Sequence, residues 1–132
     1  MIFVDTSFWL ALQLPREARH DEAASLITGV GREALVTSNH VRGETLTFLR
    51  RRAWHATAVA FLDVLERTDR LRLAFVNPDL ETEALQWLRR HNEREYSFVD
   101  ATSFALMRSL RIREAFAFDG DFSAAGFVEL RA

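Results

Sequence analysis

The chain has 132 residues, 48% of them hydrophobic, and a formal net charge of −2. A chain of this length buries enough surface to fold without disulfides or structural metal ions, so we expect one domain over residues 1–132. It has no cysteine, and all 17 basic residues are arginines. Disulfides, thiolate zinc sites, cysteine catalysis and mechanisms that need a lysine are therefore excluded.

No stretch reaches the roughly 18 apolar residues of a membrane span, and no basic leader precedes the first apolar run. We therefore expect a soluble, cytoplasmic protein without a membrane partner.

The hydrophobic pattern predicts short strands that alternate with helices. The predicted strands are 2–5, 34–37, 71–76, 115–118 and 127–130, and the predicted helices are 7–13, 16–28, 40–52, 54–67, 79–92 and 98–110. This alternation is typical of a mostly parallel sheet with helices on both faces, a three-layer α/β/α sandwich. In such sheets the ligand crevice lies beyond the carboxyl ends of the strands.

Four acids stand where apolar residues are expected. Asp5 and Asp119 end predicted strands, whereas Glu44 and Asp100 lie within helical patterns and have no arginine three or four residues away. Two carboxylates about 4 Å apart repel each other by roughly 4 kcal/mol at an effective dielectric constant near 20. A divalent cation removes this repulsion, and hard oxygen ligands suit Mg²⁺ or Mn²⁺. We therefore expect one cation site if the four acids meet.

Asp5 and Glu44 each have a structural alternative. Asp5 precedes a helix and is followed by Thr6 and Ser7, all of which favour helix caps and turns. Glu44 borders an apolar helix face, yet it can equally be a surface residue or a partner of His40, four residues earlier.

Asp100 and Asp119 have alternatives as well. Ser97 with Asp100 three residues later fits a capping box, although a cap and a metal ligand can coexist at a helix N-terminus. Asp119 begins an Asp-Gly pair that is typical of hairpins, but residues 123–126 do not look like a returning strand. Asp121 is a possible fifth acid of the site or a solvent-facing residue.

The clearest basic groups are Arg50–Arg52 and Arg89–Arg90. Arginines neutralise RNA phosphates, but they are also common at the solvated C-terminal turns of helices. Trp54 and Phe48, near the triple arginine, can serve as stacking surfaces. We expect both to pack in the core instead.

The order of these acids resembles that of the PIN-domain nucleases, and most of all the small VapC-type toxins of bacterial toxin–antitoxin pairs. The resemblance spans essentially the whole chain. It is carried by IFVDTSFW at 2–9, the H-x-x-A pattern at 20–23, GETLTFLRRR at 43–52, SFVDATSFALMR at 97–108 and AFAFDGDFSAAGF at 115–127.

The resemblance implies an endoribonuclease that depends on Mg²⁺ or Mn²⁺, with an RNA substrate, a cognate antitoxin protein and a homodimeric state. Asp5 and Asp100 would be the primary ligands, Glu44 a ligand directly or through water, and Asp119 an outer ligand or water orienter. Ser7 would hold a water or a phosphate oxygen, and Asp121 is an accessory candidate. Substrate binding would involve Arg50, Arg51 and Arg52.

Two other classes of protein share parts of this pattern. Receiver and haloacid-dehalogenase domains also carry a strand-end aspartate, but they need a lysine, and the second aspartate of their D-x-D nucleophile motif is replaced here by Ser7. A catalytically inactive module that acts through a protein partner is the remaining alternative. A docking groove would then be formed by the apolar residues Phe8, Trp9, Leu10, Leu12 and Leu14.

Overall fold

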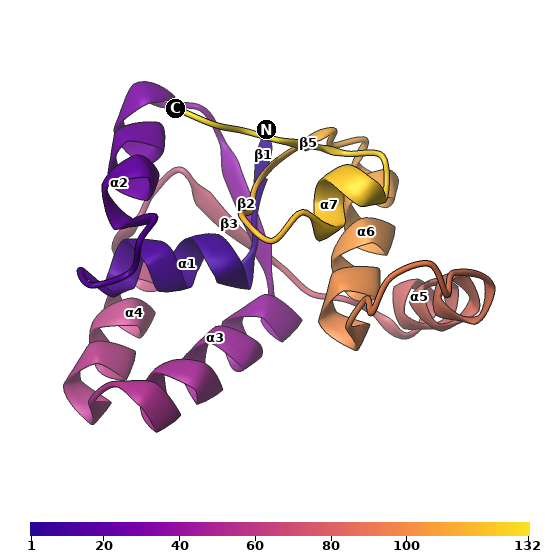
Figure 1. Cartoon of the computed structure of the whole chain (residues 1–132), viewed down its shortest axis with the longest axis horizontal. Coiled ribbons are helices and arrows are strands. Elements are labelled where there is room, and N and C mark those ends of the chain that lie inside the picture. Colours follow the sequence, from indigo (N-terminus) through magenta and orange to yellow (C-terminus); the bar gives the residue numbers. More distant parts are fainter.

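Five short strands form the central sheet in the order β3-β2-β1-β4-β5, and every neighbouring pair is parallel (Figure 1). The computed structural model describes all residues 1–132. The strands are β1 Ile2–Val4, β2 Leu35–Ser38, β3 Leu71–Ala74, β4 Glu114–Phe116 and β5 Val128–Glu129. The predicted parallel sheet is confirmed, and no hairpin forms at the Asp-Gly pair, because β4 and β5 run in the same direction.

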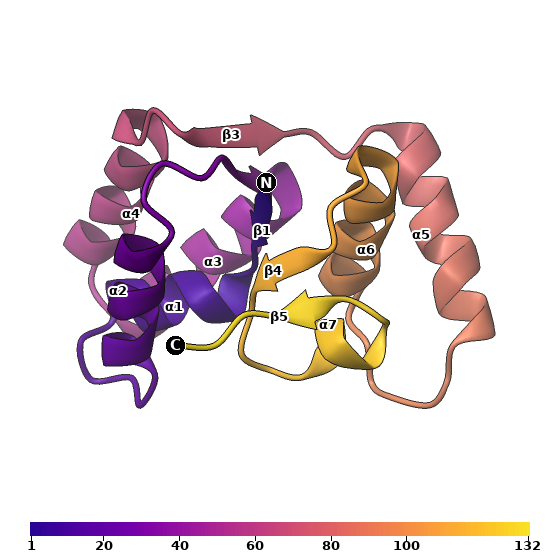
Figure 2. The same cartoon turned by 90° about the horizontal axis from the view of Figure 1, so that it is seen from above.

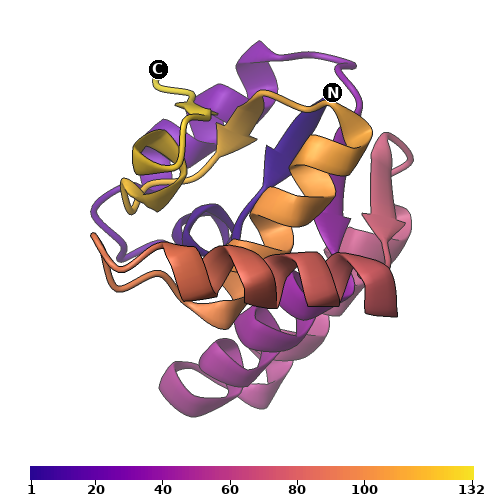
Figure 3. The same cartoon turned by 90° about the vertical axis from the view of Figure 1, so that its right-hand side faces the viewer.

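Helices cover both faces of the sheet, as the predicted three-layer sandwich requires. One face carries α1–α4 and the other α5 and α6 (Figure 2); Figure 3 views the molecule from the α5 side. The helices are α1 Thr6–Gln13, α2 His20–Gly29, α3 Asn39–Arg52, α4 His55–Arg67, α5 Pro78–Arg90, α6 Phe98–Leu110 and α7 Asp121–Ala124. None of them combines the length and apolar character that a membrane span requires.

Two helical segments differ from the prediction. Helix α2 begins at His20 instead of residue 16, because residues 15–19 form turns in which the Glu17 N–H donates to the Leu14 carbonyl. The first turn of α2 then carries Asp21 and Glu22, whose negative charge suits a helix N-terminus. The four-residue α7 was not predicted, and it begins after Gly120 in the left-handed region at φ 82°.

Capping side chains fix where three helices begin at the carboxyl end of the sheet. Asp5 caps α1, the Ser38 hydroxyl accepts from the Val41 N–H at 3.0 Å to cap α3, and Ser97 caps α6. Each such cap contributes about 1 kcal/mol. The first residues of α1, α3 and α6, which lie near the strand ends, are therefore fixed by capping residues within a few positions in the sequence.

Aromatic side chains join the helices to the sheet. Phe8 of α1 is fully buried, with its ring 4.4 Å from that of Phe116 in β4. On the other face, Phe104 of α6 contacts Phe122 of α7 edge to face at 4.9 Å. These contacts hold the first turn of α1 and the segment after β4 against the same sheet edge.

We predict that Phe8→Ala lowers the free energy of unfolding by about 3–5 kcal/mol, because it leaves a cavity between α1 and β4. Urea denaturation of the purified variant measures this loss. Leu85→Ala is the control, since Leu85 is 46% exposed on α5 and surface changes are usually within about 0.5 kcal/mol. Equal losses in both variants would contradict the assigned role of Phe8.

Candidate active site

Three of the four predicted acids, Asp5, Asp100 and Asp119, converge at the carboxyl ends of the central strands β1 and β4, where α1, α3 and α6 begin (Figure 1). Because β1 and β4 are neighbours, the residues that follow them lie side by side, and the Asp5 N–H donates to the Phe116 carbonyl at 3.0 Å. Helix α6 adds Asp100 from its third position, and α3 adds Glu44 from its second turn.

Asp5 is 2% exposed and is held by Ser7. The backbone N–H and the hydroxyl of Ser7 donate to Asp5 Oδ2 at 3.2 and 2.8 Å, so the predicted helix cap is confirmed. The same hydroxyl oxygen accepts from the Phe118 N–H at 3.0 Å, which ties α1 to the segment after β4. Burial, followed by the negative charges of Asp119 and Asp100, raises the pKa of Asp5 to about 8, although the Ser7 hydrogen bonds oppose the change.

Asp100 is 7% exposed and forms the predicted capping box. Its N–H donates to the Ser97 hydroxyl at 2.9 Å, and its Oδ2 accepts from the Ser97 N–H at 3.0 Å. Burial raises the pKa of Asp100 to about 7; the Ser97 backbone hydrogen bond opposes the rise, and the charges of Asp119 and Asp121 add to it.

Asp121 lies beside Asp100 and Asp119, a placement that the sequence left open. One carboxylate oxygen from each of Asp100, Asp119 and Asp121 lies within 4.8 Å of the other two. The pKa of Asp119 is also raised, first by partial desolvation of its carboxylate and then by the charges of Asp121 and Glu129. Asp119 is exposed as a residue, so it forms the solvent side of the group.

Each of the four aspartates uses one oxygen to hold the fold and leaves the other without a hydrogen bond. Asp5 and Asp100 use Oδ2 in their caps. Asp119 accepts from the Asp121 N–H through Oδ1 at 3.1 Å, and Asp121 Oδ1 pairs with Arg94 at 2.9 Å. Capping and ligand roles are therefore compatible in the same side chain.

Arg94 was not anticipated from the sequence. It lies between α5 and α6, 27 residues before its partner Asp121, so no local spacing connects the two. Its guanidinium also donates to the Asp119 carbonyl at 3.4 Å. It is the one arginine in an ion pair with the four aspartates.

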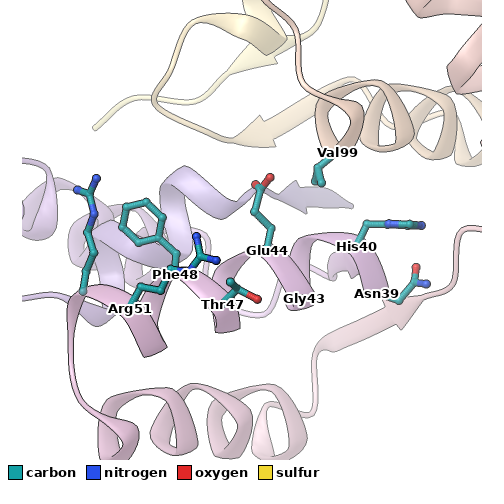
Figure 4. A pocket seen from close by; sticks show the side chains of 9 residues that line it. Asn39, His40, Gly43, Glu44, Thr47, Phe48, Arg51 and Val99 are labelled. Atoms are coloured by element: carbon teal, nitrogen blue, oxygen red, sulfur yellow. The ribbon is translucent and has the colours of Figure 1, made fainter.

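Glu44 lies at the rim of the aspartate group. It is exposed on α3 and lines a hollow of about 720 Å³ together with Val99 at the start of α6. Figure 4 shows the Glu44 side chain pointing across this hollow toward α6, with Phe48 and Arg51 further along the same helix. The considered His40–Glu44 pair is not formed, and His40 Nε2 lies 4.0 Å from Glu81 instead.

The donor chemistry of the site fits a hard divalent cation. Its groups are carboxylates with free oxygens, and it contains no sulfur ligand. The raised pKa values of Asp5 and Asp100 reflect the cost of crowding negative charge into a poorly solvated space. A bound cation would reverse that cost, and oxygen ligands of this kind suit Mg²⁺ or Mn²⁺.

The residues expected to contact substrate occupy different surroundings. Arg50 Nη1 lies 2.6 Å from His55 Nδ1, whereas Arg51 and Arg52 line the Glu44 hollow. The expected core packing of Trp54 is wrong, because Trp54 is 78% exposed. Phe48 is half-buried, with the Arg52 guanidinium 4.4 Å above its ring.

Comparisons with known proteins agree with this geometry. Residues 2–128 match the PIN domain family. The chain is 56% identical over 131 residues to the 23S rRNA-specific endonuclease VapC20 of two Mycobacterium tuberculosis strains, covering 99% of this chain and 98% of the relative. A crystal structure of M. tuberculosis VapC20, described as a sarcin-ricin loop cleaving toxin, superposes with a TM-score of 0.94 at 54% identity over the full length of both chains.

We predict that Asp5→Asn changes the pH dependence of stability in cation-free protein. Since the pKa of Asp5 rises from 3.8 to about 8 on folding, the folded state keeps a proton that the unfolded chain has released between these values. The stabilisation of the folded state by the proton on Asp5 is complete below about pH 4 and is lost as the pH rises toward 8. Asparagine can still cap α1 but does not titrate.

Denaturation in EDTA measures the effect. The stability of Asp5→Asn relative to the wild type should increase from pH 5 to pH 8, by at most about 1.4 kcal/mol per pH unit. Asp69→Asn is the control, because Asp69 is exposed in the turn before β3. A difference that stays constant with pH for Asp5→Asn would contradict the prediction.

Proposed function

The chain belongs to the PIN-domain family, as a nuclease of the VapC toxin type, and from this premise we propose that it hydrolyses RNA phosphodiester bonds with the help of Mg²⁺ or Mn²⁺. The proposal is supported by the cluster of Asp100, Asp119 and Asp121 with the buried Asp5 beside it, each with one oxygen fixed and one free, at the carboxyl end of a parallel sheet. Ligand sites of open α/β folds lie at this edge.

We propose 23S rRNA as the substrate class, with the sarcin-ricin loop as the cleaved region. The relative with 56% identity is named as a 23S rRNA-specific endonuclease, and the similar crystal structure is described as a sarcin-ricin loop cleaving toxin. Identity over nearly the full length of both chains supports the same substrate here. The cytoplasm, which contains the ribosome, is the corresponding location.

The side chains have distinct roles in the proposed reaction. Asp5 and Asp100 offer their free oxygens as the primary ligands, with Asp119 and Asp121 on the solvent side. Glu44 acts from the rim, directly or through a water. When bound, a divalent cation lowers the pKa of a water and neutralises charge on the scissile phosphate.

Ser7 holds the strand-end aspartates in register, because its hydroxyl contacts Asp5 and the backbone after β4 at once. This arrangement makes Ser7 a positioning residue for both acid-bearing segments. The single hydroxyl hydrogen of Ser7 is donated to Asp5, so a phosphate oxygen would have to displace that bond, and we assign Ser7 the positioning role.

We also propose a homodimer and an antitoxin protein as partners. Phe75 and Phe98 are 63% and 37% exposed, and exposed aromatic side chains are enriched at protein interfaces. The family supports both partners, and sedimentation of the purified protein tests the dimer.

We predict that Asp100→Asn lowers the cleavage rate of a sarcin-ricin loop RNA by at least about 100-fold in Mg²⁺ or Mn²⁺, because a charged ligand is lost while the amide oxygen can still accept from the Ser97 N–H. Single-turnover cleavage of labelled RNA measures the rate. Asp69→Asn is the matched control, with the same chemical change at a remote exposed site. Undiminished cleavage by pure Asp100→Asn protein would refute the proposed ligand set.

A second prediction separates an enzyme from an inactive binding module without measuring catalysis. Added Mn²⁺ should raise the melting temperature of the wild type in a saturable way, because a ligand that binds only the folded state stabilises it. Asp100→Asn should lose most of this gain, whereas Asp69→Asn should keep it. A wild-type melting temperature that does not respond to Mn²⁺ would favour the binding module.

A further inference from the structure

Trp54 lies where it stabilises the fold very little. It occupies the N-cap position of α4, but the indole makes no capping hydrogen bond there. Its side chain is 78% exposed, the most exposed large hydrophobic residue of the chain. Serine or asparagine would cap the helix better, and a buried tryptophan would add to the core. A large aromatic surface that does neither is available for a ligand.

The surroundings of Trp54 are positively charged. It lines a hollow of about 680 Å³, between the α1–α2 and α3–α4 connections, together with Arg16, Arg51, Arg52 and Glu17. Three guanidinium groups thus face one carboxylate. Arg16, Arg51 and Arg52 take part in no ion pair, and the Arg52 guanidinium lies over the Phe48 ring. The volume lies within the usual range for ligand pockets.

This hollow shares lining residues with two hollows that contain predicted site residues. Arg51 and Arg52 also line the hollow that contains Glu44. Glu17 also lines a smaller hollow of about 290 Å³ that contains Ser7 and Asp119. A chain bound along this surface would therefore reach from Trp54 to the carboxylates.

We propose that Trp54, Arg16, Arg51 and Arg52 bind one unpaired nucleobase of the RNA and the phosphates on either side of it. The proposal rests on the proposed ribonuclease function and adds a substrate subsite to it. A nucleobase stacks on an exposed indole regardless of its sequence, and guanidinium groups match phosphate geometry. An acidic peptide would satisfy the arginines but leave the indole face uncovered.

Arg50 does not belong to this subsite, although it is adjacent in sequence to Arg51. It contacts His55 and lines another hollow with Leu46 and Val59, which Arg51 also borders. Of the triple arginine, only Arg51 and Arg52 line the hollow that contains Trp54.

The test measures binding of a fluorescein-labelled RNA hairpin, with the sarcin-ricin loop sequence, to full-length protein carrying Asp100→Asn. Trp54→Ser should weaken binding by roughly 5- to 150-fold, the range for the loss of one stacked base. Its melting temperature should be unchanged or higher, because serine caps α4. Trp54→Phe should restore binding to within about threefold of the tryptophan protein.

The arginines have a different signature. Arg51→Ala should weaken binding and reduce the slope of log Kd against log salt by roughly 0.7 to 1, which corresponds to one lost phosphate contact. Trp54→Ser should leave that slope unchanged. In the active protein, Trp54→Ser should raise KM and leave kcat within about twofold, because the indole acts on binding and not on the reacting atoms.

Leu85→Ala and Arg90→Ala are the matched controls, since both residues are exposed on α5, which lies across the sheet from α4 and its N-cap Trp54. An unchanged Kd in Trp54→Ser would overturn the proposal. Competition by hexaglutamate that depends on Arg51 but not on Trp54 would assign the hollow to a protein tail instead. Absence of cleavage by the wild type would overturn the ribonuclease function, whereas the hairpin Kd tests this subsite alone.

Discussion

Electrostatic repulsion among carboxylates that are partly removed from water is the constraint on which the rest of this structure depends. Asp5 and Asp100 are buried with raised pKa values, and Asp119 adds negative charge beside both. The fold tolerates the group because each aspartate has a hydrogen-bond donor for one oxygen. A divalent cation bound to the oxygens left over, as proposed above, would convert the repulsion into binding energy.

The segment that carries Asp119 is held by the C-terminal residues. The Glu129 carboxylate accepts from the Gly120 N–H at 3.3 Å and from the Ser123 N–H at 2.9 Å, and its side chain is almost fully buried. Arg131 pairs with Glu129 and donates to the Ala117 carbonyl at 2.8 Å. These contacts fix the approach of Asp119, although Glu129 adds to the negative charge there. Glu129 therefore positions the Asp119 segment even though its negative charge repels the Asp119 carboxylate.

Charge is segregated across the functional surface, which the net charge of −2 conceals. The carboxylates occupy the centre with a single paired arginine, Arg94, whereas unpaired guanidinium groups and the exposed Trp54 lie at the periphery. This layout suits the proposed function, in which an RNA would be held at its flanks while its backbone meets a bound cation at the centre. Arg94 limits the excess negative charge beside Asp121 without entering the buried part of the group.

Local sequence patterns were enough to predict the parallel sandwich, ten of the eleven element positions to within about two residues, and the placement of acids at strand ends and helix starts, because periodicity and capping are local properties. Features that depend on distant neighbours emerged only in the folded chain. Tertiary structure shortened α2, formed α7 and paired Asp121 with Arg94, and it left Glu44 at the rim. It also exposed Trp54, because hydrophobicity does not reveal which side of a chain connection faces solvent. No spacing in the sequence reveals which distant residues become neighbours when the chain folds.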